Sequence, residues 1–168
     1  RYNTKNSALT TNNIKTIIKG NENEFWIGTE NSGVFKFSKL TNKITKLNNV
    51  NDPIKSLFFK DDILWIGTAG KGLKRYNTKS NNLLTYTKEN GLPNNVIYGI
   101  LPDNENNLWL SSNIGLTKFS LRKETETPII ENYNNYDGLQ ALEFNTGAYF
   151  KSQDGTLYFG GLEGINWF

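Results

Sequence analysis

The sequence predicts an all-β protein made of repeated four-stranded antiparallel sheets, the blades of a β-propeller. Three observations support this fold class. A motif centred on an aromatic ring recurs along the 168 residues at Trp26, Trp65, Trp109 and Tyr158, with spacings of 39, 44 and 49 residues. Each ring is followed by a glycine and an apolar residue, at 33–34, 72–73, 115–116 and 164–165. Four strands in about 40 to 45 residues is the pattern of a propeller blade.

The chain begins with a partial repeat. Residues 1–5 are identical to residues 75–79, which the repeat places at the end of a third strand. We therefore expect the chain to start late in a third strand and to enter a fourth strand near residues 7–10. This blade remnant spans residues 1–12.

Three whole blades follow, at about 13–50, 51–93 and 94–136, and an incomplete last blade occupies about 145–168. Turn-forming segments at 21–24, 60–62, 103–107 and 154–155 separate the first strand from the second in each blade, as in β-hairpins. The two terminal pieces could together complete a fourth blade. We expect instead that residues 1–168 form about four blades of a larger propeller, or that two copies associate through their open sides.

The motif has a packing explanation. A blade is a twisted sheet that buries both faces against its neighbours, so the ring on the second strand is expected to fill the wedge between two blades. The glycine after the ring leaves room where backbones converge, and the glycine that opens the third strand permits a tight entry.

Composition argues against several functions. The 19 basic and 16 acidic residues are interspersed, whereas nucleic-acid binders concentrate basic residues on one face, so we expect no nucleic-acid partner. The chain has no cysteine and no histidine, which removes thiol chemistry and the commonest general base and metal ligand. No apolar run reaches the length of a membrane span, so no membrane insertion by this fragment is expected.

Two chemical candidates remain, and both have simpler interpretations. Glu143 and Glu163 could form a carboxylate pair, but both fall in predicted loops. Asp103 opens a segment like a calcium loop, yet Leu108 and Ile114 stand where that loop needs a glycine and an acid. We therefore predict no catalytic residue, no metal site and no cofactor.

Several motifs together resemble the two-component regulator propeller repeat. These are Leu-Trp-Ile-Gly-Thr at 64–68, Gly-Leu-Lys-Arg-Tyr-Asn-Thr-Lys at 72–79, and Tyr-Thr-Lys-Glu-Asn-Gly-Leu-Pro-Asn-Asn at 86–95. The segment 137–168 looks like a closing blade of the same family, and the third repeat departs from the pattern with Ser111-Ser112 in place of Gly-Thr.

The resemblance implies a role as well as a fold. Such repeats form the periplasmic sensor region of hybrid two-component histidine kinases, which are anchored in the membrane and in many cases detect oligosaccharides. This fragment would then be a ligand-sensing segment, while the kinase lies elsewhere in the parent protein. Two alternatives stay open: a scaffold for protein–protein interaction or homodimerisation, and a propeller lyase or glycosidase, which the missing histidine disfavours.

A ligand site is expected on one face of the blades. The loop between second and third strands and the connection to the next blade share that face, and their amides and carboxylates suit the hydroxyls of an oligosaccharide. A ring such as Tyr98 or Tyr136 could stack on a sugar. The predicted ligand-binding residues are Glu30, Asn31, Lys71, Asn94, Asn95, Asn113, Gln140, Glu143, Asn145 and Glu163.

Overall fold

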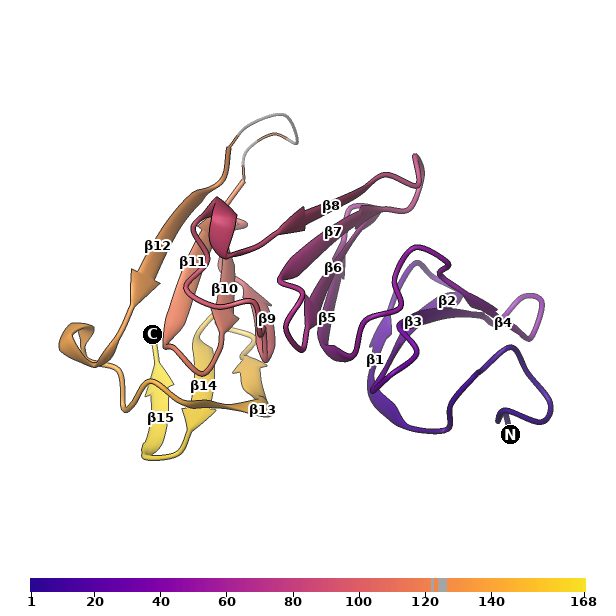
Figure 1. Ribbon diagram of the computed structural model, residues 1–168, viewed down its shortest axis with the longest axis horizontal. Coiled ribbons are helices and arrows are strands. Elements are labelled where there is room, and N and C mark those ends of the chain that lie inside the picture. Colours follow the sequence, from indigo (N-terminus) through magenta and orange to yellow (C-terminus); the bar gives the residue numbers. More distant parts are fainter. Residues whose placement is uncertain (122, 124–126) are drawn as a thin grey trace.

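The described strands form four antiparallel sheets that follow one another in chain order (Figure 1). The computed structural model describes residues 1–121, 123 and 127–168. Three sheets have four strands and the last has three, which confirms the predicted all-β propeller fold with blades of antiparallel strands. Part of the predicted blade 94–136, namely residues 122 and 124–126, lies outside the described residues.

We number the sheets as blades 1 to 4. Blade 1 consists of β1 (Ile14–Lys19), β2 (Glu24–Thr29), β3 (Val34–Ser38) and β4 (Lys43–Lys46). Blade 2 consists of β5 (Ile54–Lys60), β6 (Ile63–Thr68), β7 (Leu73–Asn77) and β8 (Leu83–Tyr86). Blade 3 consists of β9 (Gly99–Pro102), β10 (Leu108–Ser111), β11 (Leu116–Ser120) and β12 (Ile129–Tyr133). Blade 4 consists of β13 (Phe144–Lys151), β14 (Leu157–Gly161) and β15 (Gly164–Trp167), and two short 3₁₀ helices precede blades 3 and 4 at Lys88–Asn90 and Asn135–Asp137.

The many asparagines serve the tight turns between strands. Among the described residues, those other than glycine with positive φ are Asn or Asp: Asn42, Asp61, Asp62, Asn81 and Asn106. These two residue types tolerate the left-handed region because their short polar side chains can hydrogen-bond locally. Three asparagines and two aspartates thus supply the left-handed residues of the tight turns between short strands.

A glycine opens the third strand of each complete blade because no larger residue fits there. Gly33, Gly72 and Gly115 have φ of 77°, 77° and 80°. A Cβ atom on Gly72 would overlap the carbonyl oxygen of Tyr86 at the end of β8, and the other two glycines meet an equivalent carbonyl. The third strand thus starts directly beneath the connection that leads to the next blade.

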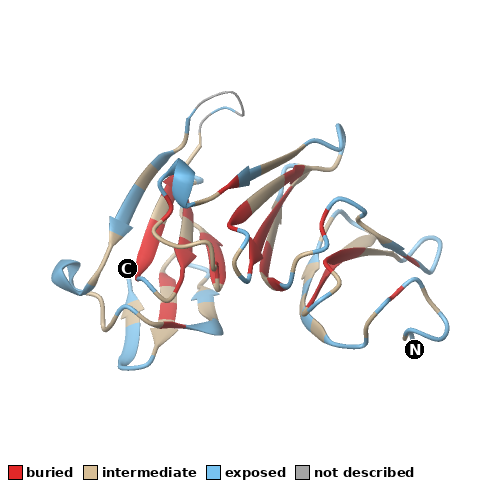
Figure 2. Cartoon of the chain, viewed as in Figure 1, coloured by how far each residue is buried: buried red, intermediate tan, exposed pale blue. Residues whose placement is uncertain are grey.

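The blades are joined by aromatic wedges. The second-strand ring of each complete blade packs on a ring at the end of the next blade's third strand, and the centroids lie 6.5 Å apart for Trp26–Tyr76, 5.6 Å for Trp65–Phe119 and 4.5 Å for Trp109–Phe168. Between blades 2 and 3 this wedge also contains Leu73, which is fully buried. Figure 2 shows that the buried residues follow the strands through the interior of the blades, while the loops are mostly exposed.

The first strands of the blades meet at the centre of the molecule. The strand β5 contacts both β1 and β9, and β13 contacts β9 and β5. In blades 1 and 2 the pairing of the first strand with the second is interrupted by a bulge, and in blade 4 by a longer irregularity. A bulged residue is unpaired and its side chain is re-aimed, which bears on the site described below.

The expected strand near residues 7–10 is wrong, because residues 1–13 contain no strand. The backbone N–H of Asn3 donates to the side chain of Asn6 at 2.8 Å, as the N–H of Thr87 donates to Asn90 at 2.8 Å after β8. Leu9 is then buried against blade 1, as Leu92 is against blade 3. Residues 3–13 therefore correspond to a connection between blades, and the identity with residues 75–79 misplaces them by one strand.

We predict that Gly72→Ala lowers the free energy of unfolding by about 1–3 kcal/mol more than Gly70→Ala does. Both glycines have positive φ, so both substitutions incur the same kind of backbone strain. Only the Gly72 methyl group would meet the Tyr86 carbonyl, whereas nothing lies near a Cβ on Gly70. Urea unfolding of the two variants measures the difference, and equal losses would contradict the packing explanation.

We also predict that Trp65→Ala lowers the free energy of unfolding by about 3–5 kcal/mol, because the ring fills the wedge between blades 2 and 3. Leu40→Ala is the control: Leu40 is 77% exposed, and its removal should change stability by no more than about 0.5 kcal/mol. Chemical unfolding followed by tryptophan fluorescence and circular dichroism compares the two.

Candidate functional site

The predicted face of the blades exists, and repeated backbone bonds hold it together. We call it the loop face: it contains the loops between second and third strands and the connections between blades. In blade 1 the N–H of Glu30 donates to the carbonyl of Asn13 at 3.1 Å, and the N–H of Ala69 donates to Pro53 at 2.9 Å in blade 2. Bonds from Gly72 to Asn95 and from Gly115 to Leu142, both 2.8 Å, join neighbouring blades on this face.

The bulges of blades 1 and 2, and the equivalent position of blade 3, place one side chain from each complete blade at the centre of the loop face. In the pairing of the first strand with the second, Lys15 has no partner between the paired residues Ile14 and Thr16. Lys55 likewise has no partner between Ile54 and Ser56. Tyr98 occupies the same position in blade 3, since it directly precedes the paired residue Gly99. In blade 4 the irregularity between Phe144 and Tyr149 is longer and exposes residues 145–147.

Charged groups surround these residues, both within blade 1 and between blades. Lys15 Nζ lies 3.0 Å from Glu30 Oε2, and Asn13 also donates to Glu30. Lys55 Nζ lies 6.0 Å from the ring centroid of Tyr98, and the Glu143 carboxylate is near enough to the Tyr98 hydroxyl to raise its pKa. We call Lys15, Glu30, Lys55, Tyr98 and Glu143 the axial cluster, because it combines groups from all four repeats where the first strands converge.

The electrostatics of the cluster follow from these contacts. The hydrogen bond from Lys15, with the positive charges of Lys15 and Lys55, lowers the pKa of Glu30 below its ordinary value. Burial, with the negative charge of Glu143 nearby, raises the pKa of Tyr98. At neutral pH Glu30 is therefore ionised and the Tyr98 phenol is protonated, and both lie beside lysine side chains.

Four of the predicted ligand-binding residues use their side-chain amides in hydrogen bonds to neighbouring loops. The backbone carbonyl of Asn95 accepts from Gly70 and Gly72, and its side chain accepts from the N–H of Lys88 at 2.9 Å. The Asn94 side chain accepts from Val96 at 3.1 Å and donates to Asn113. Gln140 accepts from the N–H of Glu163 at 2.7 Å and donates to the carbonyl of Glu143 at 3.3 Å. These amides shape the loops of the face.

The remaining six predicted ligand-binding residues lie on the same face, and their side chains are more accessible to a ligand. Glu30 and Glu143 belong to the axial cluster, and Asn145 is exposed in the irregular segment of β13. Asn31, Lys71 and Glu163 are exposed in the loops between second and third strands. Tyr136, the other ring considered for stacking, is 94% exposed. The ligand-binding role of the ten residues stays a prediction.

Sequence analysis missed Lys15 and Lys55. A signal for them exists in the repeat, because an isoleucine followed by one variable residue and then Thr, Ser or Gly recurs at 14–16, 54–56 and 97–99. The variable residue is the bulge position. It is Lys in blades 1 and 2 and Tyr in blade 3, and the preceding isoleucine is the same in all three blades.

The chemical alternatives gain no support from the geometry. Glu143 and Glu163 are linked through Gln140, which binds the backbone of both. Asp103 accepts from the N–H groups of Glu105 and Asn107 at 2.9 and 2.8 Å, as a turn-forming aspartate does. Across residues 1–121, 123 and 127–168 no group of three or more acidic, His or Cys side chains could hold a metal ion.

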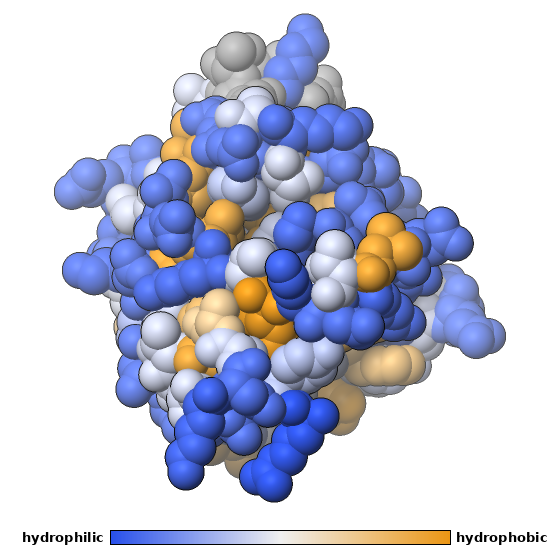
Figure 3. Space-filling view, turned by 90° about the vertical axis from the view of Figure 1, so that its right-hand side faces the viewer, coloured by the Kyte–Doolittle hydropathy of each residue, from blue (hydrophilic) through white to orange (hydrophobic). Residues whose placement is uncertain are grey.

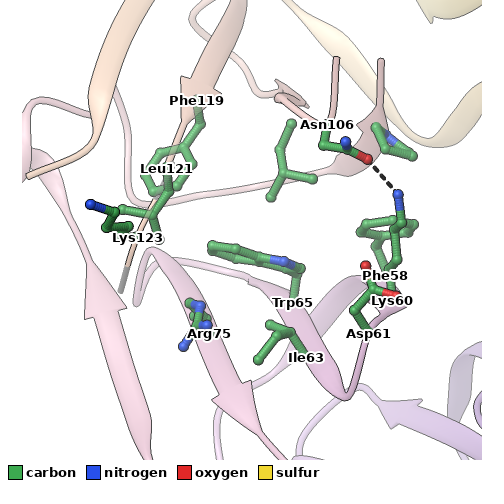
Figure 4. Close-up of a pocket in the computed structure, with 12 residues that line it drawn as sticks. Phe58, Lys60, Asp61, Ile63, Trp65, Arg75, Asn106, Phe119, Leu121 and Lys123 are labelled. Carbon is green, nitrogen blue, oxygen red and sulfur yellow. Dashed lines mark hydrogen bonds between the residues drawn. The ribbon is translucent and has the colours of Figure 1, made fainter. Parts of the chain in front are cut away.

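A separate cavity of about 290 Å³ lies between blades 2 and 3 and contains none of the ten predicted residues. Figure 4 shows the Trp65 ring extending into it, with Phe119 and Leu121 on one side and Phe58 on the other. Lys60 of blade 2 donates to Asn106 of blade 3 across this cavity. The cavity is the outer part of the aromatic wedge, at the end of the blades where first and second strands are joined.

The comparisons with known proteins agree with the fold and the motifs. A family model described as two component regulator propeller matches residues 91–113. Histidine kinase P4 of Formosa agariphila is 30% identical over 176 aligned residues, which are 94% of this chain and 12% of the kinase.

Solved structures give the same result. The extracellular domain of a protein described as a hybrid two component system of B. thetaiotaomicron is 26% identical, with a TM-score of 0.83 over 99% of this chain and 23% of that one. A computationally designed protein, 15% identical with a TM-score of 0.67, shares the fold over 96% of this chain and 94% of its own.

These findings define the chain as a β-propeller protein. More particularly, residues 91–113 match the two component regulator propeller model, and the fold is similar to that of an extracellular domain of a hybrid two component system, in agreement with the sequence motifs. The chain spans 12% of the curated relative and 23% of the similar extracellular domain. No helix in the described part of the chain is long and apolar enough to cross a membrane.

We predict that Glu143→Gln lowers the pKa of Tyr98, because it removes the negative charge that disfavours the phenolate. The pKa should stay above that of an ordinary tyrosine, since burial is the larger cause of the shift. A pH titration by NMR with ring-labelled tyrosine measures it, and Glu163→Gln serves as a control that should leave Tyr98 unchanged. An unaltered Tyr98 pKa in Glu143→Gln would contradict the contact between the two residues.

Proposed function

We propose that this chain is a ligand-sensing segment in the extracytoplasmic, periplasmic region of a hybrid two-component sensor kinase, and that its ligand is an oligosaccharide. The similarity to extracellular domains of such systems and to a histidine kinase supports the sensing role. The kinase would be elsewhere in a longer, membrane-anchored protein. The chain itself would bind the ligand and transmit the signal, and it would catalyse no reaction.

The axial cluster is the observation that carries the binding proposal. It brings two ammonium groups, two carboxylates and a phenol from four separate repeats to one place on the loop face. Side chains so far apart in sequence meet only because the first strands converge. Binding groups held by a rigid scaffold in this way favour affinity, because little conformational freedom is lost when a ligand binds.

An oligosaccharide suits this arrangement chemically. Each sugar hydroxyl both donates and accepts, so it can pair with the lysine donors and the carboxylate acceptors of the cluster. The half-exposed Tyr98 ring offers an apolar surface beside them. Bound ligand would shift the parent receptor between two arrangements by its difference in affinity for them.

We predict that the chain binds members of an array of immobilised neutral and acidic oligosaccharides, and that Lys55→Gln and Glu143→Gln each weaken this binding about tenfold or more. A hydrogen bond to a charged group contributes about 1.5–3 kcal/mol, which corresponds to that loss. The measurement is array fluorescence of the labelled chain, followed by calorimetric titration with the sugars that bind.

Matched controls remove the same charges away from the loop face. Lys43→Gln in β4 and Glu22→Gln in the turn between β1 and β2 are both exposed, so they should bind as the unmodified chain does. Equal losses in cluster and control variants would place the ligand elsewhere. A chain that binds no oligosaccharide on the array would refute the proposed ligand class.

A further inference from the structure

The cavity between blades 2 and 3 arises at one position of the repeat, near the end of the first strand. Phe59 of blade 2 pairs with Leu64 as Pro102 of blade 3 pairs with Leu108, so the two residues are equivalent. The Phe59 ring reaches toward the preceding blade and lies 6.2 Å from the ring of Trp26. Proline closes its side chain onto its own backbone, so Pro102 cannot extend a ring into the wedge in the same way.

The equivalent residue of blade 4 also bridges to the blade before it. Lys151 pairs with Leu157 in the same register, and its ammonium group donates to Asn104 of blade 3 at 3.0 Å. Side chains at this position thus connect blade 2 to blade 1 and blade 4 to blade 3. The wedge between blades 2 and 3 has no such side chain from Pro102, and the cavity of about 290 Å³ lies there.

A second difference between the wedges makes this cavity apolar. Tyr76 and Phe119 are equivalent third-strand rings, because they pair with Leu64 and Leu108. The Tyr76 hydroxyl donates to Asn81 at 2.6 Å, whereas Phe119 has no hydroxyl. Seven of the twelve residues that line the cavity are apolar: Phe58, Ile63, Trp65, Pro102, Leu108, Phe119 and Leu121.

The Trp65 wall of the cavity is already fixed in place. The Trp65 ring stacks on Tyr86 with centroids 6.3 Å apart and meets the edge of Phe119 at 5.6 Å. The guanidinium carbon of Arg75 lies 5.9 Å from its centroid. Figure 4 shows the Trp65 ring in the middle of the cavity, with Phe119, Arg75 and Ile63 around it. A wall fixed in this way can receive a flat ring with little loss of conformational freedom.

The rim of the cavity carries hydrogen-bond donors and an acceptor. Lys60 donates to Asn106 across the cavity, and Asp61 lies next to Lys60 in the turn between β5 and β6. A hydroxyl group both donates and accepts, so it can pair with the lysine and with the carboxylate. A charged ligand group would be repelled by one of the two, because Lys60 and Asp61 have opposite charges.

This cavity differs from the scattered apolar residues of the surface. From the side of blade 1, Figure 3 shows a mostly hydrophilic surface with apolar atoms in small groups between polar ones. Exposure of that kind is ordinary in proteins. Between blades 2 and 3, by contrast, apolar side chains line one concave space and the polar groups stand at its rim. Small-molecule sites commonly have this form.

We propose that the cavity between blades 2 and 3 binds a phenolic compound, that is, a flat aromatic ring system with a hydroxyl group and no charge. The ring occupies the space beside Trp65 that corresponds to the place of the Phe59 ring beside Trp26. The hydroxyl group lies at the rim with Lys60 and Asp61. This site is separate from the axial cluster, because Lys60 and Lys55 lie near opposite ends of β5, and it does not depend on the proposed oligosaccharide sensing.

The first test adds 2-naphthol, a neutral two-ring phenol, to the chain labelled with ¹⁵N at its tryptophan indoles. We expect the Trp65 indole resonance, assigned from Trp65→Phe, to shift with a dissociation constant of about 1 mM or lower, as suits so small a ligand. The resonances of Trp26 and Trp167 are internal controls and should not shift. Trp26 lies beside Phe59, and Trp167 is 69% exposed outside the cavity.

Pro102→Phe tests the origin of the cavity. The variant supplies the ring that blade 2 has at Phe59, so it should fill the cavity and weaken 2-naphthol binding about tenfold or more. Its circular dichroism should match that of the unmodified chain, which shows that lost binding is not lost fold. Pro53→Phe is the matched control, because it adds the same ring at an exposed proline at the other end of β5 and should leave binding unchanged.

The methyl ether of 2-naphthol tests the role of the rim. The ether cannot donate a hydrogen bond, so it should bind about two- to tenfold more weakly than 2-naphthol. Asp61→Gly should reduce this difference, and glycine tolerates the φ of 49° at this position. Lys55→Gln and Glu143→Gln should leave 2-naphthol binding unchanged, so this test is independent of the oligosaccharide proposal.

Three results would overturn the proposal. A Trp65 resonance that does not shift at the solubility limit of 2-naphthol would show that the cavity takes no such ligand. Binding that persists unchanged in Pro102→Phe would place the phenol elsewhere. Equal binding of 2-naphthol and its methyl ether would show that the rim does not recognise the hydroxyl group.

Discussion

The packing of a second-strand ring against the third-strand end of the following blade is the interaction on which the rest of this structure depends. A blade is too thin to bury its apolar residues alone, so each sheet is stable only when both faces are covered. The rings of Trp26, Trp65 and Trp109 fill the wedges that open between twisted sheets as they fan out. Large aromatic side chains suit this task because each buries much apolar surface in one rigid unit.

This packing also explains where backbone freedom is needed. Once the rings set the angle between blades, the connection to the next blade must pass over the start of the third strand. The carbonyls of Val50, Tyr86 and Tyr133 then approach so closely that only glycine fits beneath them. The glycine that opens each third strand is therefore required by the close approach of the connection, which returns to the loop face above it.

The candidate site depends on the same constraint. Because the first strands converge, the bulge residues Lys15, Lys55 and Tyr98 approach the centre from three repeats, and Glu143 joins them from the fourth. The isoleucine before this position is kept in three repeats, whereas the residue at the position is Lys in two of them and Tyr in the third. A repeated fold can therefore carry a different side chain at this position without disturbing its core.

The sequence by itself determined the repeat, the all-β class, the hairpin turns and the face on which Glu30 and Glu143 lie, because these follow from local pattern: alternating strands, turn residues and a ring at a fixed place. Tertiary structure alone decided that Asn95 and Gln140 are held in loop hydrogen bonds and that Lys15 and Lys55 face the centre. It also decided that residues 3–13 are a connection, although residues 1–5 match a strand end letter for letter. The reason is that packing against blade 1 determines the conformation of this segment: Leu9 is buried there, and a five-residue identity does not encode the neighbour that a segment will meet.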